Sequence, residues 1–509
     1  MDAIELTLFS HRIQAVCDEM GANLMRTAFS PNIKDRLDFS CAIFNADGQL
    51  CGQAAHIPVH LGSMAFAMSN IISQFEWRPG DMVILNDPFL GGTHLPDVTL
   101  IAPLFFNNKL CAFIANRAHH ADIGSDTPGS MPIANNINQE GLIISPKFLL
   151  RNFKYHENTL NDILNSLHNP EMGKADFNAQ ISSINHGLQR LNQLVGKTGF
   201  EKFIAALEHL NNYSELLAKT VFKNIPEGEY YFSDFMDDDG AGNTNIEIKV
   251  KIKIKDEKID VDFDGTADQV KGNINCPVSV TAAAVYYCFY SLMPPHTPAC
   301  AGSFRPVKLS VPDGCFINAN HPAAVAAGNV ETSTRIVDVV LGALAQAIPE
   351  TIPAASHGSM NNIAMGSEKW DYYETLGGGM GANMNGDGQD AVQTHMTNTL
   401  NTPIEILEKY YPLRINQYAI RKNSGGEGKY TGGDGLIREY IFLEPCTVTL
   451  LTERRESSPW GIQGGEAGSK AINFLNSKKL PAKTEIQTEA NDCLTIMTAG
   501  GGGWGAASD

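Results

Sequence analysis

A chain of 509 residues, 43% of them hydrophobic and 18% charged, has the composition of a globular protein. It is too long for one ordinary core, so we expect about two to four domains. The formal net charge of −18 argues against sequence-independent nucleic-acid binding, which requires basic patches. No apolar run reaches about eighteen residues, so we predict no transmembrane helix and no membrane partner.

The cysteines indicate a reducing compartment. Ten are scattered along the chain and none forms a C-x-x-C pair, a pattern typical of intracellular proteins whose cysteines lie in the core. Residues 1–5 are acidic and do not open a signal peptide. We therefore expect a cytoplasmic protein.

Local patterns near the N-terminus predict alternating helices and strands. Apolar residues at helical spacing predict a helix over 2–26, which Asp2 can cap. Strands are expected over 39–44 and 81–85, with a helix over 63–74 between them.

The pattern changes further along the chain. Residues 151–225 carry three apolar stripes at helical spacing, whereas residues 246–254 alternate strictly, as in a half-exposed antiparallel strand. Helices are expected over 273–290 and 332–347, and the last hundred residues alternate short strands with Gly-rich turns.

These elements predict an α+β protein with several domains. We expect a metal-binding hairpin region near the N-terminus, a helical middle segment and a β-rich, Gly-rich C-terminal region. The predicted boundaries are 1–150 for a metal-binding α/β domain, 151–225 for a helical segment, 226–320 for an antiparallel β domain with a helix, and 321–509 for a mixed, β-rich domain.

One stretch, residues 86–126, concentrates metal-competent side chains. Residues 98–106 and 110–115 are apolar and β-prone, and Asn107-Asn108-Lys109 between them is a turn signal. The resulting hairpin brings together its two polar ends, which contain His94, Asp97, His119, His120 and Asp122. Imidazole and carboxylate ligands suit zinc, manganese or iron rather than a thiolate site.

We prefer a metal site over the alternative that these side chains only hydrogen-bond the turns. Asp38, from the earlier strand, could supply a fourth ligand. His119 and His120 point to opposite faces if they continue a strand, so only one of them need face the metal. Asp87 and Asp122 could instead orient the imidazoles.

Other polar segments have two interpretations. His56 and His60 flank Pro58, so they are expected to line a pocket or cap a turn rather than to form a helical ligand pair. The polar stretch 387–405 suits either a substrate-facing loop or a network of turns. The acidic run 237–239 lacks the spacing of a calcium loop and is expected to be a solvated turn.

The segments that resemble nucleotide-binding or nucleophile motifs lack the surrounding sequence that such sites require. Gly500–Gly505 matches G-x-G-x-x-G in letters, but no helix follows it, and the Walker spacing is absent at Gly428-Lys429. The glycines at 377–381 are expected to mark a close backbone approach. Cys276 is more simply explained as a buried cysteine than as a nucleophile. The chain therefore has no recognisable ATP site of its own.

Several long motifs, in order, resemble the hydantoinase B / 5-oxoprolinase family, which includes the acetone carboxylase α subunit and the caprolactamase β subunit. They cover nearly the whole chain and include Asp35–Ala42, His56–Gly62, Asn86–Asp97, His119–Gly124, Pro128–Pro132, Gly272–Pro277, Gly328–Ser333, His395–Thr399, Ser424–Gly426, Glu453–Arg455 and Gly500–Gly505.

The resemblance implies one subunit of a multi-component enzyme in a hetero-oligomer. The partner would be a hydantoinase A-type, actin-like ATPase that binds ATP and phosphorylates a small cyclic amide. This chain would hold one divalent metal, zinc, manganese or iron, and metal-activated water would open the lactam or hydantoin ring. The alternatives are a subunit of an acetone carboxylase-like ketone carboxylase and a non-catalytic, metal-stabilised scaffold for the ATPase.

The resemblance also implies roles for individual residues. Asp38, His94, Asp97 and His119 would be the metal ligands, with His120 as the alternate to His119. We assign catalytic roles to His120 and Asp122. The predicted substrate-binding residues are His56, His60, Asn86, Asp87, His395, Thr397 and Asn398.

Overall fold

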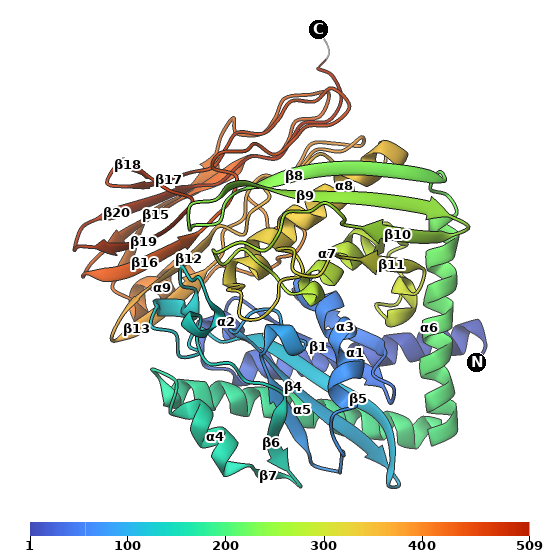
Figure 1. The fold of residues 1–509 in the computed structure, drawn as a ribbon. Helices are drawn as coiled ribbons and strands as arrows, with labels where there is room; N and C mark the ends of the chain where they lie inside the picture. The colour runs from blue at the N-terminus through green and yellow to red at the C-terminus, as the bar shows by residue number, and fades with distance from the viewer. Residues whose placement is uncertain (56, 508–509) are drawn as a thin grey trace.

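A computed structural model describes residues 1–55 and 57–507 (Figure 1). It has a mixed α+β architecture with four sheets, as the sequence predicts. In Figure 1 the N-terminal sheet lies at the bottom, the middle of the chain above it, and the C-terminal strands at the upper left.

The N-terminal sheet carries the predicted metal-binding hairpin. Its strand order is β2-β1-β5-β4-β3-β6-β7. The strands are β1 (Phe39–Asn45), β2 (Leu50–Ala55), β3 (Met82–Leu85), β4 (Asp97–Phe106), β5 (Lys109–His119), β6 (Lys147–Arg151) and β7 (Lys154–Tyr155). The predicted hairpin is confirmed as β4 and β5, and both turn residues Asn107 and Asn108 adopt the left-handed conformation that asparagine tolerates.

Helices cover both faces of this sheet because its central strands are apolar on both sides. Cys41 and Ile43 of β1 face the core formed with α1 (Ala3–Thr27) and α5 (Pro170–Thr198). Ala42 and Phe44 face the opposite core, which includes α3 (Val59–Ile72). Asp2 caps α1 by accepting a hydrogen bond from the Glu5 N–H, as predicted.

The remaining N-terminal and middle helices are short or bridge the layers. They are α2 (Pro31–Lys34), η1 (Pro88–Leu90), η2 (Pro128–Ser130), η3 (Ile137–Gln139), α4 (Glu157–Leu164) and α6 (Phe200–Phe222). In Figure 1, α6 runs upward from the level of the N-terminal sheet to that of the middle sheet.

The middle of the chain forms a second sheet, ordered β11-β10-β9-β8, that packs on two buried helices. Its elements are β8 (Gly228–Asp238), β9 (Thr244–Lys255), β10 (Lys258–Asp262), α7 (Val278–Ser291), η4 (Ala301–Phe304), β11 (Val307–Ser310), the π-helix η5 (Gly328–Thr332) and α8 (Ser333–Ala347). Burial alternates along β9, as its sequence predicts. Helix α3 packs on α7 and so joins the two layers.

The C-terminal third is β-rich, as predicted, and forms sheets ordered β13-β12-β16-β19 and β14-β15-β20-β17-β18. Its elements are β12 (Asn362–Ser367), β13 (Trp370–Glu374), α9 (Ile404–Tyr410), β14 (Leu413–Arg421), β15 (Gly435–Phe442), β16 (Cys446–Leu451), β17 (Ile472–Leu475), β18 (Lys478–Leu480), β19 (Lys483–Thr488) and β20 (Cys493–Met497). The predicted close backbone approach is confirmed: a Cβ on Gly379 would lie 1.9 Å from the Gly433 carbonyl oxygen.

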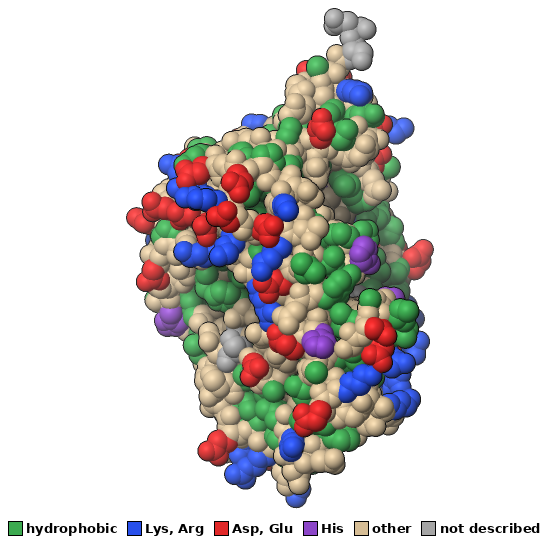
Figure 2. Space-filling view, turned by 90° about the vertical axis from the view of Figure 1, so that its right-hand side faces the viewer, with side chains coloured by type: hydrophobic (Ala, Val, Ile, Leu, Met, Phe, Trp, Pro, Cys, Tyr) green, Lys and Arg blue, Asp and Glu red, His purple; other side chains and the backbone are tan. Residues whose placement is uncertain are grey.

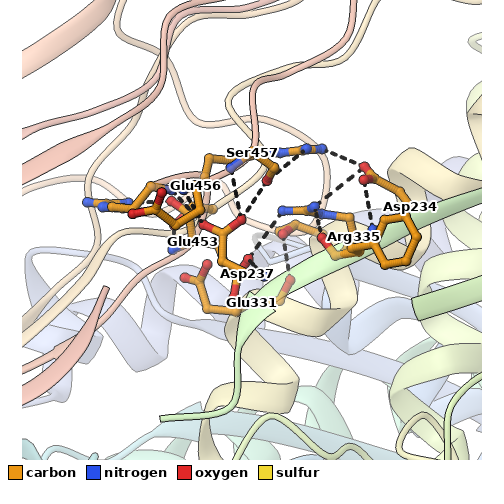
Figure 3. Close-up of polar contacts among 12 residues, drawn as sticks. Asp234, Asp237, Glu331, Arg335, Glu453, Glu456 and Ser457 are labelled. Carbon is orange, nitrogen blue, oxygen red and sulfur yellow. Dashed lines mark hydrogen bonds and ion pairs between the residues drawn. The ribbon is translucent and has the colours of Figure 1, made fainter. Parts of the chain in front are cut away.

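A buried ionic network ties the C-terminal region to the middle layer (Figure 3). Arg335 of α8 lies 3.4 Å from an Asp234 carboxylate oxygen of β8 and 3.3 Å from one of Glu453, which follows β16. Glu453 also accepts the Asp237 N–H, and Asp237 accepts the Ser457 hydroxyl at 2.6 Å.

This network corrects one prediction. The run 237–239 was expected to be a solvated turn, yet Asp237 and Asp239 are 6% and 0% exposed. Their carboxylates satisfy buried backbone N–H groups from other segments, which a turn in water would not require.

One face of the molecule is mixed in charge. On the face drawn in Figure 2, acidic and basic side chains are interspersed with hydrophobic ones. Among the described residues, no helix combines the length and the hydrophobicity needed to cross a membrane. All ten cysteines are free and all but Cys493 are buried, in agreement with the core positions expected for them.

Candidate metal centre

The hairpin register places two candidate ligands opposite each other. Asp97 is the first residue of β4 and pairs with His119, the last residue of β5. His94 lies three residues before Asp97, in the turn that enters the strand. Segments at the two ends of the hairpin therefore meet, as predicted.

Asp97, His94 and His119 form a compact cluster. Asp97 Oδ1 lies 3.3 Å from His94 Nε2 and 3.5 Å from His119 Nδ1, and the three residues are at most 2% exposed. Ligand atoms that bind one tetrahedral ion at about 2.1 Å lie roughly 3.4 Å apart. His94 Nε2 and Asp97 Oδ1 have no hydrogen-bond partner within residues 1–55 and 57–507, as expected for donor atoms that face an ion. The cluster therefore fits a divalent metal.

The electrostatics agree with this assignment. Burial by itself would raise the pKa of Asp97, but the neighbouring His94 and His60 outweigh it and hold that pKa well below its usual value. Burial lowers the pKa of His119, which keeps the imidazole neutral. An ionised carboxylate, as at Asp97, and a neutral imidazole, as at His119, are protonation states that bind a metal.

His60 also joins this cluster. Its Nε2 lies 3.3 Å from Asp97 Oδ2, and its Nδ1 lies 3.1 Å from Ser40 Oγ. The same Asp97 oxygen accepts the Thr93 hydroxyl and, at 3.4 Å, the Asn329 amide. His60, predicted to bind substrate, is therefore held against the second oxygen of the candidate ligand.

Asp38 lies at the edge of the group. Its Oδ2 is 3.9 Å from both His119 Nδ1 and Arg36 Nη2. Its role as a fourth ligand stays a prediction.

Buried partners orient the His94 imidazole. His94 Nδ1 lies 3.3 Å from the Ala326 carbonyl oxygen, an arrangement that leaves Nε2 for a metal. The N–H groups of Val325 and Ala326 donate to one oxygen of Glu140 at 2.8 and 2.9 Å. Burial raises the pKa of Glu140 to about 8.

A second chain of contacts reaches His119. Its ring stacks on Tyr373 of β13, whose hydroxyl donates to Asn362 Oδ1 at 2.6 Å. The Asn362 amide donates to Glu331 at 2.7 Å. Glu331 and Asn329 both lie on η5, so this π-helix supports the cluster from two sides.

A cavity of about 20 Å³ adjoins the cluster, enough for roughly one water molecule. Its walls include Asp38, His60, Asp97, His119, Asn329, Met360, Tyr373 and Thr397. A cyclic amide is several times larger, so its entry requires some of these side chains to move.

The structure separates His120 and Asp122 from the cluster. His120 Nε2 lies 3.0 Å from Gln180 Oε1, and its ring stacks on Phe177 of α5. Asp122 accepts the N–H groups of Gly124 and Asn169. The opposite orientation of His119 and His120 is thus as expected, and His119 is the one at the cluster. The catalytic roles of His120 and Asp122 stay predictions.

Asn86 and Asp87 serve the turns around the hairpin. Asn86 donates to the Leu95 and Leu142 carbonyls and accepts the Ile144 N–H. Asp87 accepts the Phe89 N–H and the Ser145 hydroxyl. These contacts occupy their polar atoms, and their substrate-binding roles stay predictions.

Parts of the polar stretch 387–405 form a network of turns, and another part lies beside the cavity. Asp387 and Asp390 accept backbone N–H groups of the 431–434 segment and so belong to a turn network. Thr397 lines the cavity, whereas Asn398 is exposed. The predicted substrate residue His56 lies outside the described residues.

Sequence reasoning missed Asn329, Glu331, Tyr373 and Glu140. Asn329 and Glu331 lie in the motif Gly328–Ser333, so the signal was present without an assigned role. Tyr373 and Glu140 carry no local signal, because their contacts bridge segments far apart in the chain. Cys276 is buried, and burial raises its pKa to about 12, as expected for a structural cysteine.

The fold and the histidine–carboxylate cluster define an α+β protein with a candidate metal centre. The chain matches the hydantoinase B/oxoprolinase family over residues 2–507 and belongs to that family.

Its relatives include two kinds of protein. An uncharacterized protein of Methanocaldococcus jannaschii is 40% identical over 99% of this chain and 91% of the relative. The 5-oxoprolinase of Dictyostelium discoideum is 37% identical over 99% of this chain but only 40% of the relative. The chain thus spans about two fifths of the length of that enzyme.

Two solved structures share the fold. The ATP-dependent caprolactamase of Pseudomonas jessenii has a TM-score of 0.93 and 25% identity, over 99% of this chain and 91% of that chain. A nucleotide-free acetone carboxylase has a TM-score of 0.88, over 99% of this chain and 76% of that chain, but at 17% identity this likeness concerns the fold alone.

Proposed function

We propose that this chain is the metal-binding subunit of an ATP-dependent cyclic-amide hydrolase of the 5-oxoprolinase or hydantoinase type. The observation that carries the proposal is the buried cluster of His94, Asp97 and His119 beside a small cavity. The likeness to 5-oxoprolinases and to a caprolactamase supports a cyclic amide as substrate.

Each residue of the cluster has a role in this proposal. His94, Asp97 and His119 would hold one divalent metal, which when bound polarises a carbonyl and lowers the pKa of water. Thr93 and Asn329 donate to Asp97 Oδ2 and fix the carboxylate, while Ala326 fixes His94. Burial keeps bulk water away from the cluster. His60 Nε2, held against Asp97, is placed to carry a proton beside the cavity.

The ATP-dependent step is assigned to a partner. The chain carries no recognisable phosphate-binding loop, so we propose that an actin-like ATPase subunit of the hydantoinase A type phosphorylates the substrate. The uniformly free cysteines support a cytoplasmic complex. A hydrolase is favoured over a ketone carboxylase because the carboxylase likeness extends to the fold alone.

The test compares metal content in matched variants. Wild type, Asp97→Ala, His119→Asn and His120→Asn would be purified without added metal, checked by circular dichroism and measured by inductively coupled plasma mass spectrometry. We expect about one metal per chain in wild type and His120→Asn, and loss of metal in the other two. The wild-type chain, combined with an ATPase subunit, should then couple ATP hydrolysis to 5-oxoproline consumption.

Two results would contradict the proposal. Folded Asp97→Ala and His119→Asn that keep their metal would show that the ligands lie elsewhere. A metal-loaded wild-type complex that turns over ATP without opening any cyclic amide would remove the hydrolase assignment.

A further inference from the structure

A second polar group lies outside the candidate metal centre, on two segments that also contribute residues to the cavity wall. Within the described part of the chain, His357 Nδ1 and Nε2, both polar atoms of Gln393, and His395 Nε2 are inaccessible to solvent and have no hydrogen-bond partner. His357 is 2% exposed as a residue. A buried polar atom without a partner costs about 1–3 kcal/mol, so three such side chains together call for a functional explanation.

Backbone pairing brings these side chains into one region. The His357 side chain packs against Gly378, where a Cβ would lie 2.5 Å from His357 Cβ. Gly378 exchanges two backbone hydrogen bonds with Val392, at 3.0 and 2.9 Å, and Gln393 follows Val392 directly. His357 and Gln393 therefore stand on adjoining segments.

His395 is fixed two residues further on. It adopts a left-handed conformation with φ of 57°, which is uncommon outside glycine and recurs at functional sites. The Tyr287 hydroxyl of α7 lies 3.4 Å from its Nδ1, so Nε2 is the ring nitrogen left unpaired among the described residues.

The same two segments continue to the metal centre. Met360 follows His357 by three residues and Thr397 follows His395 by two, and both line the cavity beside Asp97. A molecule that reached the cluster would lie against these segments.

The chemistry of the group suits a ring amide. Burial, with the nearby His395 next, lowers the pKa of His357 to about 3, and burial also lowers the pKa of His395. Two neutral imidazoles and a carboxamide each offer a donor and an acceptor. A cyclic amide presents the complementary N–H and C=O.

We propose that His357, Gln393 and His395 form the subsite that recognises the amide group of the cyclic-amide substrate. This inference rests on the proposed function and adds His357 and Gln393 to the residues expected from the sequence.

The experiment measures binding of 5-oxoproline, hydantoin and caprolactam to the full chain by calorimetry, with metal content determined for each sample. The variants are His357→Phe, Gln393→Leu and His395→Asn, because asparagine tolerates the left-handed backbone at 395. Gln389→Leu, at an exposed position four residues before Gln393, is the control.

We expect at least one of the three compounds to bind, and each subsite variant to weaken that binding about fivefold to thirtyfold. Metal content should be unchanged, and Gln389→Leu should bind as wild type. If His357→Phe does not fold, Gln393→Leu and His395→Asn decide the question.

Three outcomes would overturn the inference. Binding that is unchanged in folded subsite variants would show that the unpaired atoms hold only water. Displacement of the bound compound by inorganic phosphate at this group would show an anion site instead. A metal-loaded wild type that binds none of the three compounds would also remove the proposed function, whereas the first two outcomes leave it standing.

Discussion

The imidazole of His119 lies parallel to the phenol ring of Tyr373, with the ring centroids 4.7 Å apart and the planes inclined by 7°. Arg36 also lies over the Tyr373 ring, 4.8 Å from its centroid. One β13 residue thus fixes a candidate ligand at the end of β5, and the C-terminal region becomes part of a centre built on the N-terminal sheet.

This contact predicts a graded effect on metal affinity. Tyr373→Leu removes the stacking surface, and we expect metal binding to weaken roughly tenfold to a hundredfold, as for other groups that orient ligands. Tyr373→Phe keeps the ring and loses only the hydrogen bond to Asn362, so its effect should be smaller. Competition titration with a chromophoric chelator measures both. Equal affinities in all three proteins would show that the stack does not position His119.

Asp38 and Asp97 should differ in their importance for the metal. Asp97→Asn should abolish tight binding, because Asp97 Oδ1 lies within 3.5 Å of both histidines. Asp38→Asn should weaken binding less, since Asp38 Oδ2 lies farther from His119 Nδ1, at 3.9 Å. The same titration, with calorimetry for the weak variant, gives the order. A stronger effect at Asp38 would reverse the assignment of the main carboxylate ligand.

Glu140 should make stability depend on pH. Its pKa rises from the ordinary 4.5 to about 8 because it is buried, so the folded chain keeps a proton that the unfolded chain releases. The associated stabilisation is fully present below about pH 4.5 and is lost as the pH rises to about 8. Glu140→Gln has no such proton to lose. Its free energy of unfolding, relative to that of wild type, should therefore rise by about 1 kcal/mol or more between pH 5 and pH 8.

Urea unfolding at the two pH values tests this expectation. Glu157→Gln, at an exposed position in α4, serves as the control and should follow wild type. Identical pH dependence in Glu140→Gln and wild type would mean that Glu140 is ionised in the folded chain.

The buried network around Arg335 should contribute strongly to stability. Arg335→Met removes one of the two cations beside each carboxylate and leaves Lys483 with Glu453 and Arg454 with Asp234. Removing one member of a buried ion pair costs about 3–5 kcal/mol. Arg190→Met removes an exposed pair with Glu19 and should change stability little. Denaturant unfolding at neutral pH compares the two. Similar losses in both variants would show that the network is not held together by Arg335.

Local sequence patterns account for most of the elements. The helical spacing after Asp2, the alternation over 246–254 and the turn Asn107-Asn108 each predict an element that the structure contains. Such features depend on hydrogen bonds and side-chain periods within one segment, which neighbouring residues are sufficient to specify. Helix boundaries are predicted less well: α3 starts at Val59 rather than at the predicted Ser63, because no sequence signal marks its first turn.

The sequence also determined the ligand types and their meeting. A hairpin returns its second strand to the start of the first, so the ends that carry Asp97 and His119 were expected to meet, whereas their direct pairing also depends on a register shift between Leu104 and Phe105. Only the tertiary structure decided which of His119 and His120 faces the cluster. Alternation along a strand places the two side chains on opposite faces of the sheet, but it does not determine which face α5 covers. The partners of the site, Ala326, Glu140, Asn329 and Tyr373, come from segments distant in the chain, and packing of whole layers, not any local pattern, brings them together.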